Sequence, residues 1–405
     1  MKILIIGGGA SGMMAALSAS QMPGAQVLLL ERQGKVGRKL LATGNGRCNL
    51  TNRTLSLSHY HGETPALAGP ALDGFGVDDT LDFFARLGLL TVSEESGRVY
   101  PYSDQANSVL DVLRFALDRP NLTLRCGCEV TKIKRTPEGF AVTAGGEVFS
   151  CQRLIVACGG IAGSKLGGSM SGYQLLRGLG HRCTRLRPAL VQLQSSYPKC
   201  PSLKGIRASC RAELLRDGVC VAASTGEVQF TQTGLSGPVI YEISRDACAA
   251  PGIWTCRLDL LPQVSQAGLL AWLEARQAAA PDLPAEELFT GTLHNRLGRI
   301  LTQEAELPAQ APLRSLPRER LDRAARAAKA FSLDLTGPMG MDAAQVTAGG
   351  ILLSEFDPNT LESRLVPGLF ACGEVLDLDG DCGGYNLQWA WSSGRLAGHS
   401  AGRNL

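Results

Sequence analysis

The first thirty residues alternate between apolar runs and a glycine-rich turn. Lys2–Ile6 is a short run of branched apolar residues, which is the pattern of a buried parallel strand. A helix of small and apolar residues is expected from Ala10 to Gln21, and a second apolar strand from Gln26 to Leu30. Strand, turn, helix and strand in this order predict a βαβ unit, so the chain begins as an α/β protein.

The stretch up to residue 157 continues this architecture. Helices are predicted over 77–87 and 107–117, where apolar residues fall on one face. Short apolar runs then alternate with turns, at 122–125, 129–134, 140–143, 147–151 and 154–157. We interpret them as a third parallel strand, a small antiparallel meander and a fourth parallel strand.

The pattern changes after residue 187. Short strand-like runs with many Ser, Thr and Gly residues extend to 238, and helices are predicted over 267–280, 288–306 and 318–331. From 368 an apolar strand returns, followed by a helix to about residue 401. We therefore expect one domain built from 1–188 and 344–405. A β-rich substrate or cap domain, with a helical block at 264–331, is inserted at 189–343.

Composition and charge exclude several classes of protein. The 405 residues are 44% hydrophobic and 19% charged, which favours a folded chain over a disordered one. The 40 basic and 37 acidic residues give a net charge of +3, so no nucleic-acid or membrane partner is indicated. No apolar run reaches the ~18 residues of a membrane span. The basic helix at 318–331 also carries acidic residues and is interpreted as a solvated face.

The 13 cysteines lack the spacing of a metal site or a disulfide framework, because no CxxC pair and no Cys/His cluster occurs. Scattered free thiols in a reducing compartment fit better, so we expect a cytoplasmic protein without a bound metal. The sequence leaves the oligomeric state open.

The hexapeptide Gly7-Gly-Gly-Ala-Ser-Gly12 is a GxGxxG motif. Its first glycine makes the turn, the second lets the backbone approach a pyrophosphate, and the third lets helix and strand pack closely. The helix N-terminus offers unpaired N–H groups and a partial positive charge to phosphates. Glu31 follows Gly12 by 19 residues, where an acid accepts hydrogen bonds from ribose hydroxyls. These features predict a dinucleotide-binding Rossmann domain.

The segment 37–52, GRKLLATGNGRCNLTN, indicates FAD rather than NAD. It is dense in Gly, Asn and Arg, and in glutathione-reductase-type domains the chain here runs along the pyrophosphate towards the flavin. Arg38, Lys39 and Arg47 can neutralise phosphates, and Asn45 and Asn49 can bond the ring edge. No histidine occurs in this segment, so we expect FAD to bind without a covalent link.

This segment resembles the signature of the aminoacetone oxidase family of FAD-binding enzymes, which includes flavin-dependent reductases of 3-dehydro bile acids. Further matching blocks span the chain: RVYPYS at 98–103, GGSMSGY at 167–173, GEVQFTQTGLSGP at 226–238, and 346–398 beginning with VTAGG. The resemblance implies bound FAD and an α/β fold, with a glutathione-reductase-type Rossmann FAD-binding domain, an inserted β-rich domain and a helical cap.

The C-terminal segment carries the other flavoprotein features. A strand ends in Gly373-Glu374, where the resemblance implies that the acid bonds the ribityl chain. Two glycines, at 383 and 384, precede the last helix, whose N-terminus is expected at the flavin N1–C2=O edge. By the same resemblance, the strand at 154–157 runs into the dinucleotide, and the Val130 backbone lies at the adenine.

The residues expected to contact FAD come from four parts of the chain. Those of the fingerprint and second strand are Gly7, Gly9, Ala10, Ser11, Gly12, Glu31 and Arg32. Those of the following loop are Arg38, Lys39, Thr43, Gly44, Asn45, Gly46, Arg47, Cys48 and Asn49. Those further along are Val130, Ala157, Gly159, Gly373, Glu374, Asp377, Gly384, Tyr385, Asn386 and Gln388.

The expected activity is transfer of a hydride between the flavin and a small organic substrate, as amine or aminoketone oxidation or as enone reduction. A flavin-dependent nucleic-acid-modifying enzyme and a non-catalytic flavin redox sensor are the alternatives. No second GxGxxG occurs, so NAD(P)H is at most a transient electron donor. No CxxxxC motif lies beside the flavin loop either, so the sequence does not indicate a disulfide reductase. Tyr385 is the candidate acid or base, whereas His59 and His61 are interpreted as surface residues and His181 as a helix cap.

Overall fold

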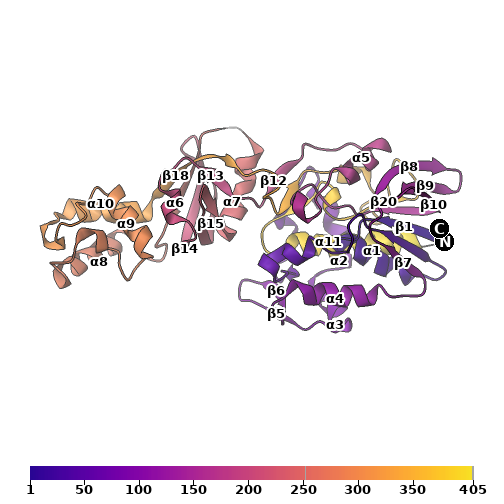
Figure 1. Cartoon of the computed structure of the whole chain (residues 1–405), viewed down its shortest axis with the longest axis horizontal. Coiled ribbons are helices and arrows are strands. Elements are labelled where there is room, and N and C mark those ends of the chain that lie inside the picture. The colour runs from indigo at the N-terminus through magenta and orange to yellow at the C-terminus, as the bar shows by residue number, and fades with distance from the viewer. Residues whose placement is uncertain (251, 404–405) are drawn as a thin grey trace. The chain divides into compact units, whose positions relative to one another are not determined.

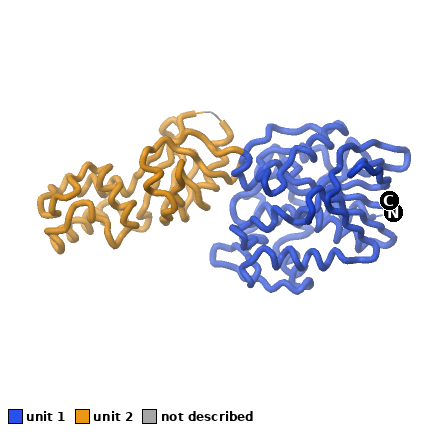
Figure 2. Tube along the Cα trace, in the orientation of Figure 1, with its two compact units in different colours: residues 1–188, 341–405 blue, residues 189–340 orange. Residues whose placement is uncertain are grey.

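The computed structural model describes residues 1–250 and 252–403, which divide into two compact units (Figure 2). Unit 1 contains residues 1–188 and 341–405, and unit 2 contains residues 189–340. The chain therefore leaves the first unit, completes the second, and returns. No helix in the described part of the chain is both long and apolar enough to cross a membrane.

Unit 1 is built on a five-stranded parallel sheet in the order β20-β11-β1-β2-β7 (Figure 1). Apolar side chains at Ile3 to Ile6 are almost fully buried, as expected for a central parallel strand. The strands are β1 (Lys2–Ile6), β2 (Gln26–Leu30), β7 (Leu122–Arg125), β11 (Arg153–Val156) and β20 (Leu369–Ala371). The predicted α/β Rossmann-type architecture is confirmed.

Smaller strands and helices complete unit 1. The meander order is β10-β9-β8, and a second three-stranded sheet has the order β3-β6-β5. These strands are β8 (Val130–Thr136), β9 (Gly139–Ala144), β10 (Glu147–Cys151), β3 (Thr51–Asn52), β5 (Thr91–Ser93) and β6 (Arg98–Pro101). Short strands elsewhere are β4 (Tyr60–His61), β21 (Asp379–Gly380), β12 (Arg187–Ala189) and β19 (Val346–Ala348).

Two helices cross unit 1 in close contact. They are α1 (Ala10–Ser20) and α11 (Tyr385–Gly402) (Figure 1). A Cβ atom on Gly394 would lie 2.4 Å from the Ser11 carbonyl oxygen, and one on Gly398 would lie 2.3 Å from that of Ala15. Glycines in the second half of α11 thus let that helix approach the first half of α1 closely. The other helices are α2 (Gly69–Gly74), α3 (Val77–Arg86), α4 (Ala106–Ala116) and α5 (Ser171–Gly178).

Unit 2 combines a closed barrel with a helical part. The barrel order is β13-β16-β15-β14-β17-β18. Its strands are β13 (Leu193–Ser195), β14 (Arg207–Arg216), β15 (Val219–Phe230), β16 (Gly234–Ser236), β17 (Trp254–Asp259) and β18 (Phe331–Pro338). Its helices are α6 (Cys200–Leu203), α7 (Pro238–Ala249), α8 (Gln266–Ala279), α9 (Asn295–Glu304) and α10 (Arg318–Lys329).

The helix predicted over 288–306 is shorter in the structure. Gly291 has a φ of +89°, which favours a turn, and α9 begins only after His294. The His294 ring caps this helix by accepting a hydrogen bond from the Arg296 amide at 3.3 Å. The prediction was therefore wrong for the first part of this segment.

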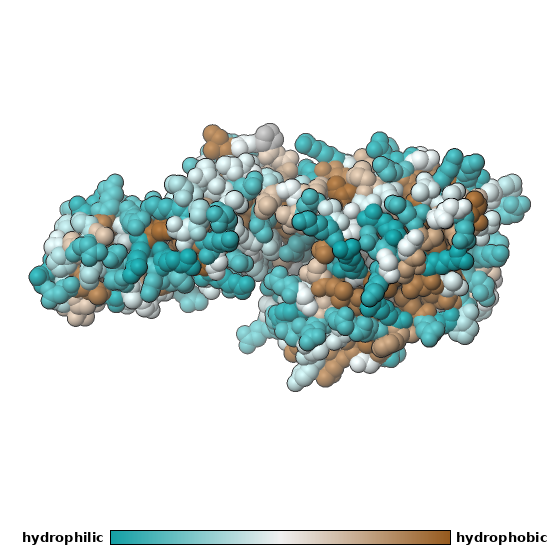
Figure 3. Space-filling model, viewed as in Figure 1, coloured by the Kyte–Doolittle hydropathy of each residue, from teal (hydrophilic) through white to brown (hydrophobic). Residues whose placement is uncertain are grey.

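The basic helix α10 has the character of a charge-compensated surface helix. Hydrophilic residues dominate the face over α8–α10 in Figure 3. Arg318 pairs with Glu274 at 2.6 Å, and Arg323 pairs with Glu306 at 2.9 Å. Pairing of this kind reduces the potential that would attract a polyanion.

Candidate active site

The glycine-rich turn packs tightly against the neighbouring strand. Gly7 has a φ of +105°, and a Cβ atom there would lie 2.4 Å from the Ala157 carbonyl oxygen. A Cβ atom on Gly12 would lie 1.8 Å from the Gly7 carbonyl oxygen. Both positions therefore exclude any larger side chain. Ala157 itself is buried at the end of β11, where its amide donates to the Ile6 carbonyl at 2.8 Å.

The next part of the turn is open. A Cβ atom on Gly9 would meet no atom within 4 Å, and no side chain of the described residues caps α1. The first N–H groups of a helix have no partner within it, so those at Ala10 and Ser11 are available to an anion. The turn thus combines free space with unsatisfied donors, which is the chemistry of a phosphate site.

Glu31 lies at the end of β2 and is only 9% exposed. Its Oε2 accepts a hydrogen bond from the Gly8 amide at 2.7 Å, and Oε1 accepts one from the Gln33 amide at 2.7 Å. These contacts fix the carboxylate beside the glycine-rich turn and leave further lone pairs for a diol. Nearby, the backbone bond from Cys128 to the Glu31 carbonyl at 2.9 Å brings the segment before Val130 to the same place.

The loop after β2 combines an exposed stretch with a half-buried residue. Gly44 and Asn45 have φ values of +57°, and both are exposed together with Gly46 and Arg38. Thr43 is half-buried, and its hydroxyl donates to the Leu40 carbonyl at 2.7 Å. The exposed stretch is thus available to a ligand.

The cations expected at the phosphates are engaged with protein groups. Lys39 Nζ lies 2.7 Å from Glu374 Oε2. Arg47 pairs with Asp104 at 2.5 Å and lies 3.9 Å over the Tyr100 ring. Arg47 is thus engaged by a carboxylate and an aromatic ring, and its contact with a phosphate stays a prediction. The Arg38 guanidinium donates to the Gln33 side chain at 3.1 Å, and that of Arg32 donates to the Gly167 carbonyl at 2.7 Å.

Cys48 lies behind the loop and is fully buried. Burial raises the pKa of its thiol to about 12, against a smaller lowering by the hydrogen bond with Thr43. A thiol in this state is a poor nucleophile and redox group. The Cys48 side chain thus packs behind the loop, and its contact with FAD stays a prediction. All 13 cysteines are free thiols, in agreement with the sequence.

An unpartnered polar atom marks the junction of this loop with α11. Asn49 Oδ1 is buried and lacks a hydrogen-bond partner among the described residues. A Cβ atom on Gly384 would lie 2.9 Å from this oxygen, and Gly384 has a φ of +102° at the start of α11. No described side chain caps that helix. Asn49 and Gly384 are 335 positions apart in the sequence. The fold thus brings a buried acceptor and the N–H donors of a helix start together.

The C-terminal strand reaches the fingerprint as well. A Cβ atom on Gly373, with a φ of +75°, would lie 2.4 Å from Ser11 Oγ. The carboxylate of the next residue, Glu374, accepts from the Thr347 amide at 2.8 Å as well as from Lys39. Gly159 is half-buried, with a φ of +68° and open space beside its Cα atom.

Three other side chains predicted to contact FAD are buried or form hydrogen bonds within the protein. Gln388 is fully buried, where its amide donates to the Phe75 carbonyl at 3.0 Å and accepts from Thr51 Oγ1 at 2.6 Å. The Asn386 amide donates to the Gly380 carbonyl at 2.7 Å and accepts from its N–H at 2.8 Å. Asp377 is 3% exposed, and burial raises its pKa. These side chains brace the site, and their contact with FAD stays a prediction.

Tyr385 lies within a polar cluster that the sequence did not reveal. Its hydroxyl is 2.9 Å from Thr54 Oγ1 and 3.3 Å from His59 Nε2, and its ring stacks on His59 at 4.2 Å. His59 and His61 both contact Asp381, at 2.9 and 2.7 Å. These histidines are thus partly exposed, as expected, but they belong to a polar cluster that their interpretation as surface residues did not include.

The ionisation of Asp381 follows from these contacts. Burial acts to raise its pKa, but the hydrogen bonds with His61 and His59 outweigh this effect and hold the pKa below the ordinary value. The cluster was missed because both histidines lie in a polar stretch, and their carboxylate is more than three hundred residues away. No group of residues suited to a metal ion is present within the described chain.

A second histidine cluster has a structural role. His181 is buried, with Nδ1 at 2.9 Å from Glu355 and Nε2 at 3.0 Å from Ser363 Oγ. Ser363 Oγ also accepts from the amides of Leu365 and Val366, at 3.1 and 2.9 Å. A buried hydroxyl occupied in this way is not a nucleophile, so this triad ties loops together rather than acting as a helix cap.

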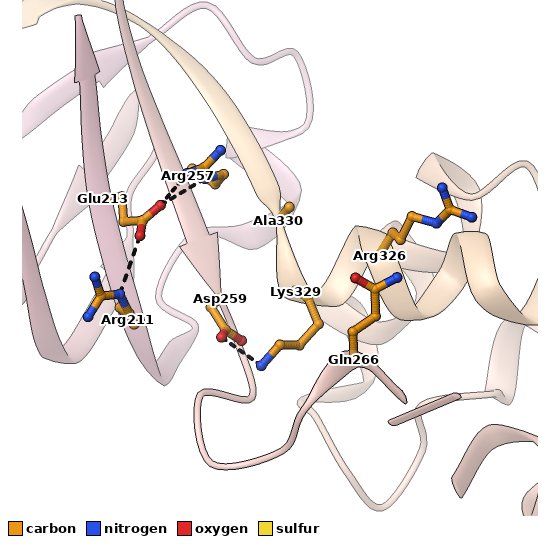
Figure 4. A pocket seen from close by; sticks show the side chains of 8 residues that line it. All are labelled: Arg211, Glu213, Arg257, Asp259, Gln266, Arg326, Lys329 and Ala330. Atoms are coloured by element: carbon orange, nitrogen blue, oxygen red, sulfur yellow. Dashed lines mark hydrogen bonds and ion pairs between the residues drawn. The ribbon is translucent and has the colours of Figure 1, made fainter. Parts of the chain in front are cut away.

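Unit 2 has a charged pocket of about 390 Å³ between the barrel and the helices (Figure 4). Its cations are paired with carboxylates: Arg257 lies 2.5 Å from Glu213, and Lys329 lies 2.6 Å from Asp259. The lining residues are Arg211, Glu213, Arg257, Asp259, Gln266, Arg326, Lys329 and Ala330. Each of its four cations lies in an ion pair with a carboxylate, unlike the open turn of unit 1.

The geometry of unit 1 is that of a dinucleotide-binding Rossmann domain. Residues 1–400 match the HI0933-like protein Rossmann domain, and the chain belongs to this family. It is 41% identical over 406 residues to a 3-dehydro-bile acid delta(4,6)-reductase of Clostridium scindens, covering 99% of this chain and 98% of the relative. It is 31% identical over 395 residues to the ribosomal RNA dihydrouridine synthase of Escherichia coli, covering 96% and 95%.

Among solved structures, the open conformation of a flavocytochrome c3 fumarate reductase resembles the chain with a TM-score of 0.49 and 15% identity. The match covers 99% of this chain and 78% of that one. A likeness this weak carries no argument about activity. The sequence relatives establish that the chain is an enzyme, an FAD-dependent oxidoreductase. The narrower name of aminoacetone oxidase finds no support among them.

Proposed function

We propose that this enzyme is an FAD-dependent reductase of a carbon–carbon double bond conjugated to a carbonyl group. The observation that carries the proposal is the near full-length similarity to a reductase named for the 4,6 double bonds of a 3-dehydro bile acid. Such double bonds are conjugated with a 3-ketone. The uracil double bond that becomes saturated in dihydrouridine is conjugated with a carbonyl too. Two relatives with different substrates thus act on one kind of bond.

The open groups of unit 1 fit FAD. The free space at Gly9 and the donors of α1 suit the pyrophosphate, and Glu31 suits the ribose diol. The buried Asn49 Oδ1 and the uncapped start of α11 offer an acceptor and donors to the polar edge of the ring. When bound, FAD supplies the two-electron chemistry of the reaction.

The other residues predicted to contact FAD have different roles in this proposal: some shape the binding turn, some contact the cofactor, and some support these parts from behind. Ala10, Ser11, Gly12 and Gly7 shape the pyrophosphate turn, and the exposed loop from Thr43 to Gly46 covers it. Lys39 and Glu374 exchange their mutual ion pair for contacts with the cofactor. Cys48 and Gln388 position the loop and α11 from behind. Binding is non-covalent, and NAD(P)H serves as the transient electron donor.

The inserted segment sets the choice of substrate in this proposal. The FAD-binding features all lie in unit 1, whereas unit 2 has its own core and barrel. Exchanging residues 189–340 for those of a relative with a different substrate should transfer the preference while FAD stays bound. If an FAD-loaded chimera kept the parent's preference, this assignment would be wrong.

A second candidate is reduction of uridine in ribosomal RNA, because the dihydrouridine synthase relative covers nearly the whole chain. The exclusion of a nucleic-acid partner on net charge is therefore not supported by this relative. The paired arginines of α10 argue against an RNA-binding stripe on that helix. A small conjugated ketone therefore remains the preferred substrate class.

The test uses the purified, FAD-loaded enzyme without oxygen. It is reduced with dithionite and mixed with a steroid 4,6-dien-3-one, with its saturated analogue, or with a ribosomal RNA fragment, while flavin absorbance is followed. The proposal predicts rapid reoxidation by the dienone alone. Reoxidation by the RNA alone would favour the second candidate. Reduction of the oxidised enzyme by aminoacetone, without any reaction of the dienone, would contradict the proposal.

A further inference from the structure

A carboxylate with two imidazoles lies just before the first turn of α11. Asp381 Oδ1 is 2.7 Å from His61 Nε2, and Oδ2 is 2.9 Å from His59 Nδ1. The three side chains are 31–37% exposed, so one edge of the cluster is open. Pairing of β4 with β21 sets His61 opposite Asp379, and the Asp381 amide donates to the His59 carbonyl at 2.9 Å, so both histidines lie beside the segment that leads to Asp381.

Hydrogen-bond directions in the cluster follow from the Asn52 amide. Asn52 Nδ2 donates to the Gly383 carbonyl at 2.9 Å, so its Oδ1 accepts from Thr54 Oγ1 at 2.9 Å. The Thr54 hydroxyl has then spent its proton, so the Tyr385 hydroxyl keeps its own and can donate it to Thr54 Oγ1 at 2.9 Å or to His59 Nε2 at 3.3 Å. Tyr385 is thereby held as a donor into the protein, and it is only 4% exposed. It is poorly placed to give its proton to a substrate.

The two histidines differ in how many of their ring nitrogens form hydrogen bonds. His59 uses both ring nitrogens, Nδ1 towards Asp381 and Nε2 towards Tyr385, and its ring is stacked on Tyr385. His61 uses Nε2 towards Asp381, and within the described residues no hydrogen bond engages its Nδ1. An ionised carboxylate holds the proton on the nitrogen that faces it, so Nδ1 is the atom of His61 that can gain and lose a proton.

We propose that His61 is the proton donor of the reduction, with Asp381 and His59 as its positioning residues; the inference rests on the function proposed above. An imidazole with one nitrogen oriented by a carboxylate and the other open is the arrangement of a general acid or base. Tyr385, the candidate from sequence, then acts by fixing His59 rather than by touching the substrate.

The chemistry balances with one proton and one hydride. The π bond of the substrate breaks, and its β carbon forms a new C–H bond with a hydride from reduced FAD, which is oxidised. The electron pair of the π bond moves towards the carbonyl oxygen. The α carbon then takes the proton that leaves His61 Nδ1. The imidazole regains a proton from water at the open edge of the cluster.

The first experiment isolates proton delivery. FAD-loaded His61→Gln is reduced with dithionite and mixed with the dienone, beside wild type and His294→Gln, whose exposed histidine only caps α9. We expect roughly 10²- to 10⁴-fold slower reoxidation for His61→Gln and an unchanged rate for His294→Gln, since general acids contribute about this much. Addition of imidazole to His61→Ala should restore part of the rate.

The second experiment needs neither FAD nor turnover. Nitrogen NMR of ring-labelled histidine in the apoprotein should show the His61 proton on Nε2, and Asp381→Asn should abolish this preference. A proton fixed on Nδ1 of wild-type His61, or a His61→Gln rate within threefold of wild type, would overturn the inference. If wild type itself does not react with the dienone, the proposed function fails instead, and the two failures are thereby distinguished.

Discussion

Two polar regions of the molecule, one in each unit, differ in how far the protein satisfies its own groups. At the fingerprint turn of unit 1, the start of α1 has no side-chain cap, and Gly9 borders free space. In the charged pocket of unit 2, Arg257 and Lys329 are each within 2.6 Å of a carboxylate. The pocket gathers more charged side chains, but each of its cations already has a carboxylate partner.

This difference teaches that a binding site is better recognised by what the fold leaves unpaired than by the charge it collects. An unpaired buried donor or acceptor costs free energy, and a ligand removes that cost. A compensated pair loses its partner when a ligand arrives, and this offsets the gain. The turn and the buried Asn49 oxygen therefore point to a ligand, and the pocket does not.

The largest effect should come from the glycines of the turn, and two of them separate binding from folding. Gly9→Val places a side chain in free space, so the apoprotein should fold while FAD affinity falls by more than about 3 kcal/mol, a hundredfold or more. Gly12→Ala sets a Cβ atom 1.8 Å from the Gly7 carbonyl oxygen and should destabilise the apoprotein itself. Flavin content and thermal unfolding check both; a fully loaded Gly9→Val protein would contradict the account.

Glu31→Ala should have an intermediate effect. It removes the ribose acceptor, and we expect FAD binding to weaken by roughly 1–3 kcal/mol. The change also leaves the amides of Gly8 and Gln33 without their acceptor, so some stability should be lost. Titration of the apoprotein with FAD measures the first effect. Glu31→Gln, which keeps one acceptor oxygen, is the matched control. Its FAD affinity should lie between those of wild type and Glu31→Ala.

Cys48→Ser should change little. The thiol is buried and its pKa is raised to about 12, so it is protonated at neutral pH and does not serve as a redox group. The variant should keep its FAD and most of its rate of flavin reduction, measured by stopped-flow absorbance. A drop of several hundredfold in that rate with FAD retained would identify Cys48 as a catalytic thiol.

The smallest effect is expected in the unit 2 pocket. Arg326→Gln removes a charge from its rim, where Arg326 is bonded to Asp322 on the same exposed helix face. Exposed pairs of this kind contribute little. FAD content and the rate of dienone reduction should match wild type. A clear loss of either would show that the pocket, despite its internal pairing, serves the reaction.

The sequence predicted what is local and missed what is distant. Gly7 to Gly12 and Glu31 lie within one βαβ unit, so their spacing alone indicated the turn and the strand end that the structure contains. Arg47 was expected at phosphates, but the fold brings Asp104 and Glu94 to it, at 2.5 and 3.1 Å. Such partners, set by tertiary packing, leave no local signal.

The same reason explains the missed histidines. His59 and His61 stand two residues apart in a polar stretch, which is equally typical of a surface loop. The pairing of β4 with β21 and the hydrogen bond from the Asp381 amide to the His59 carbonyl bring them to Asp381. One boundary between the two units lies at 188–189, where the sequence pattern changes from α/β to short strands.

The most direct test of the account is to identify what the unpaired groups of unit 1 hold. The purified protein is precipitated with acid, and the supernatant and pellet are analysed by absorbance and mass spectrometry. The account predicts a yellow supernatant that contains FAD in a one-to-one ratio with the chain, and a colourless pellet. Flavin retained on the pellet, FMN in the supernatant, or a protein that binds no flavin would contradict it.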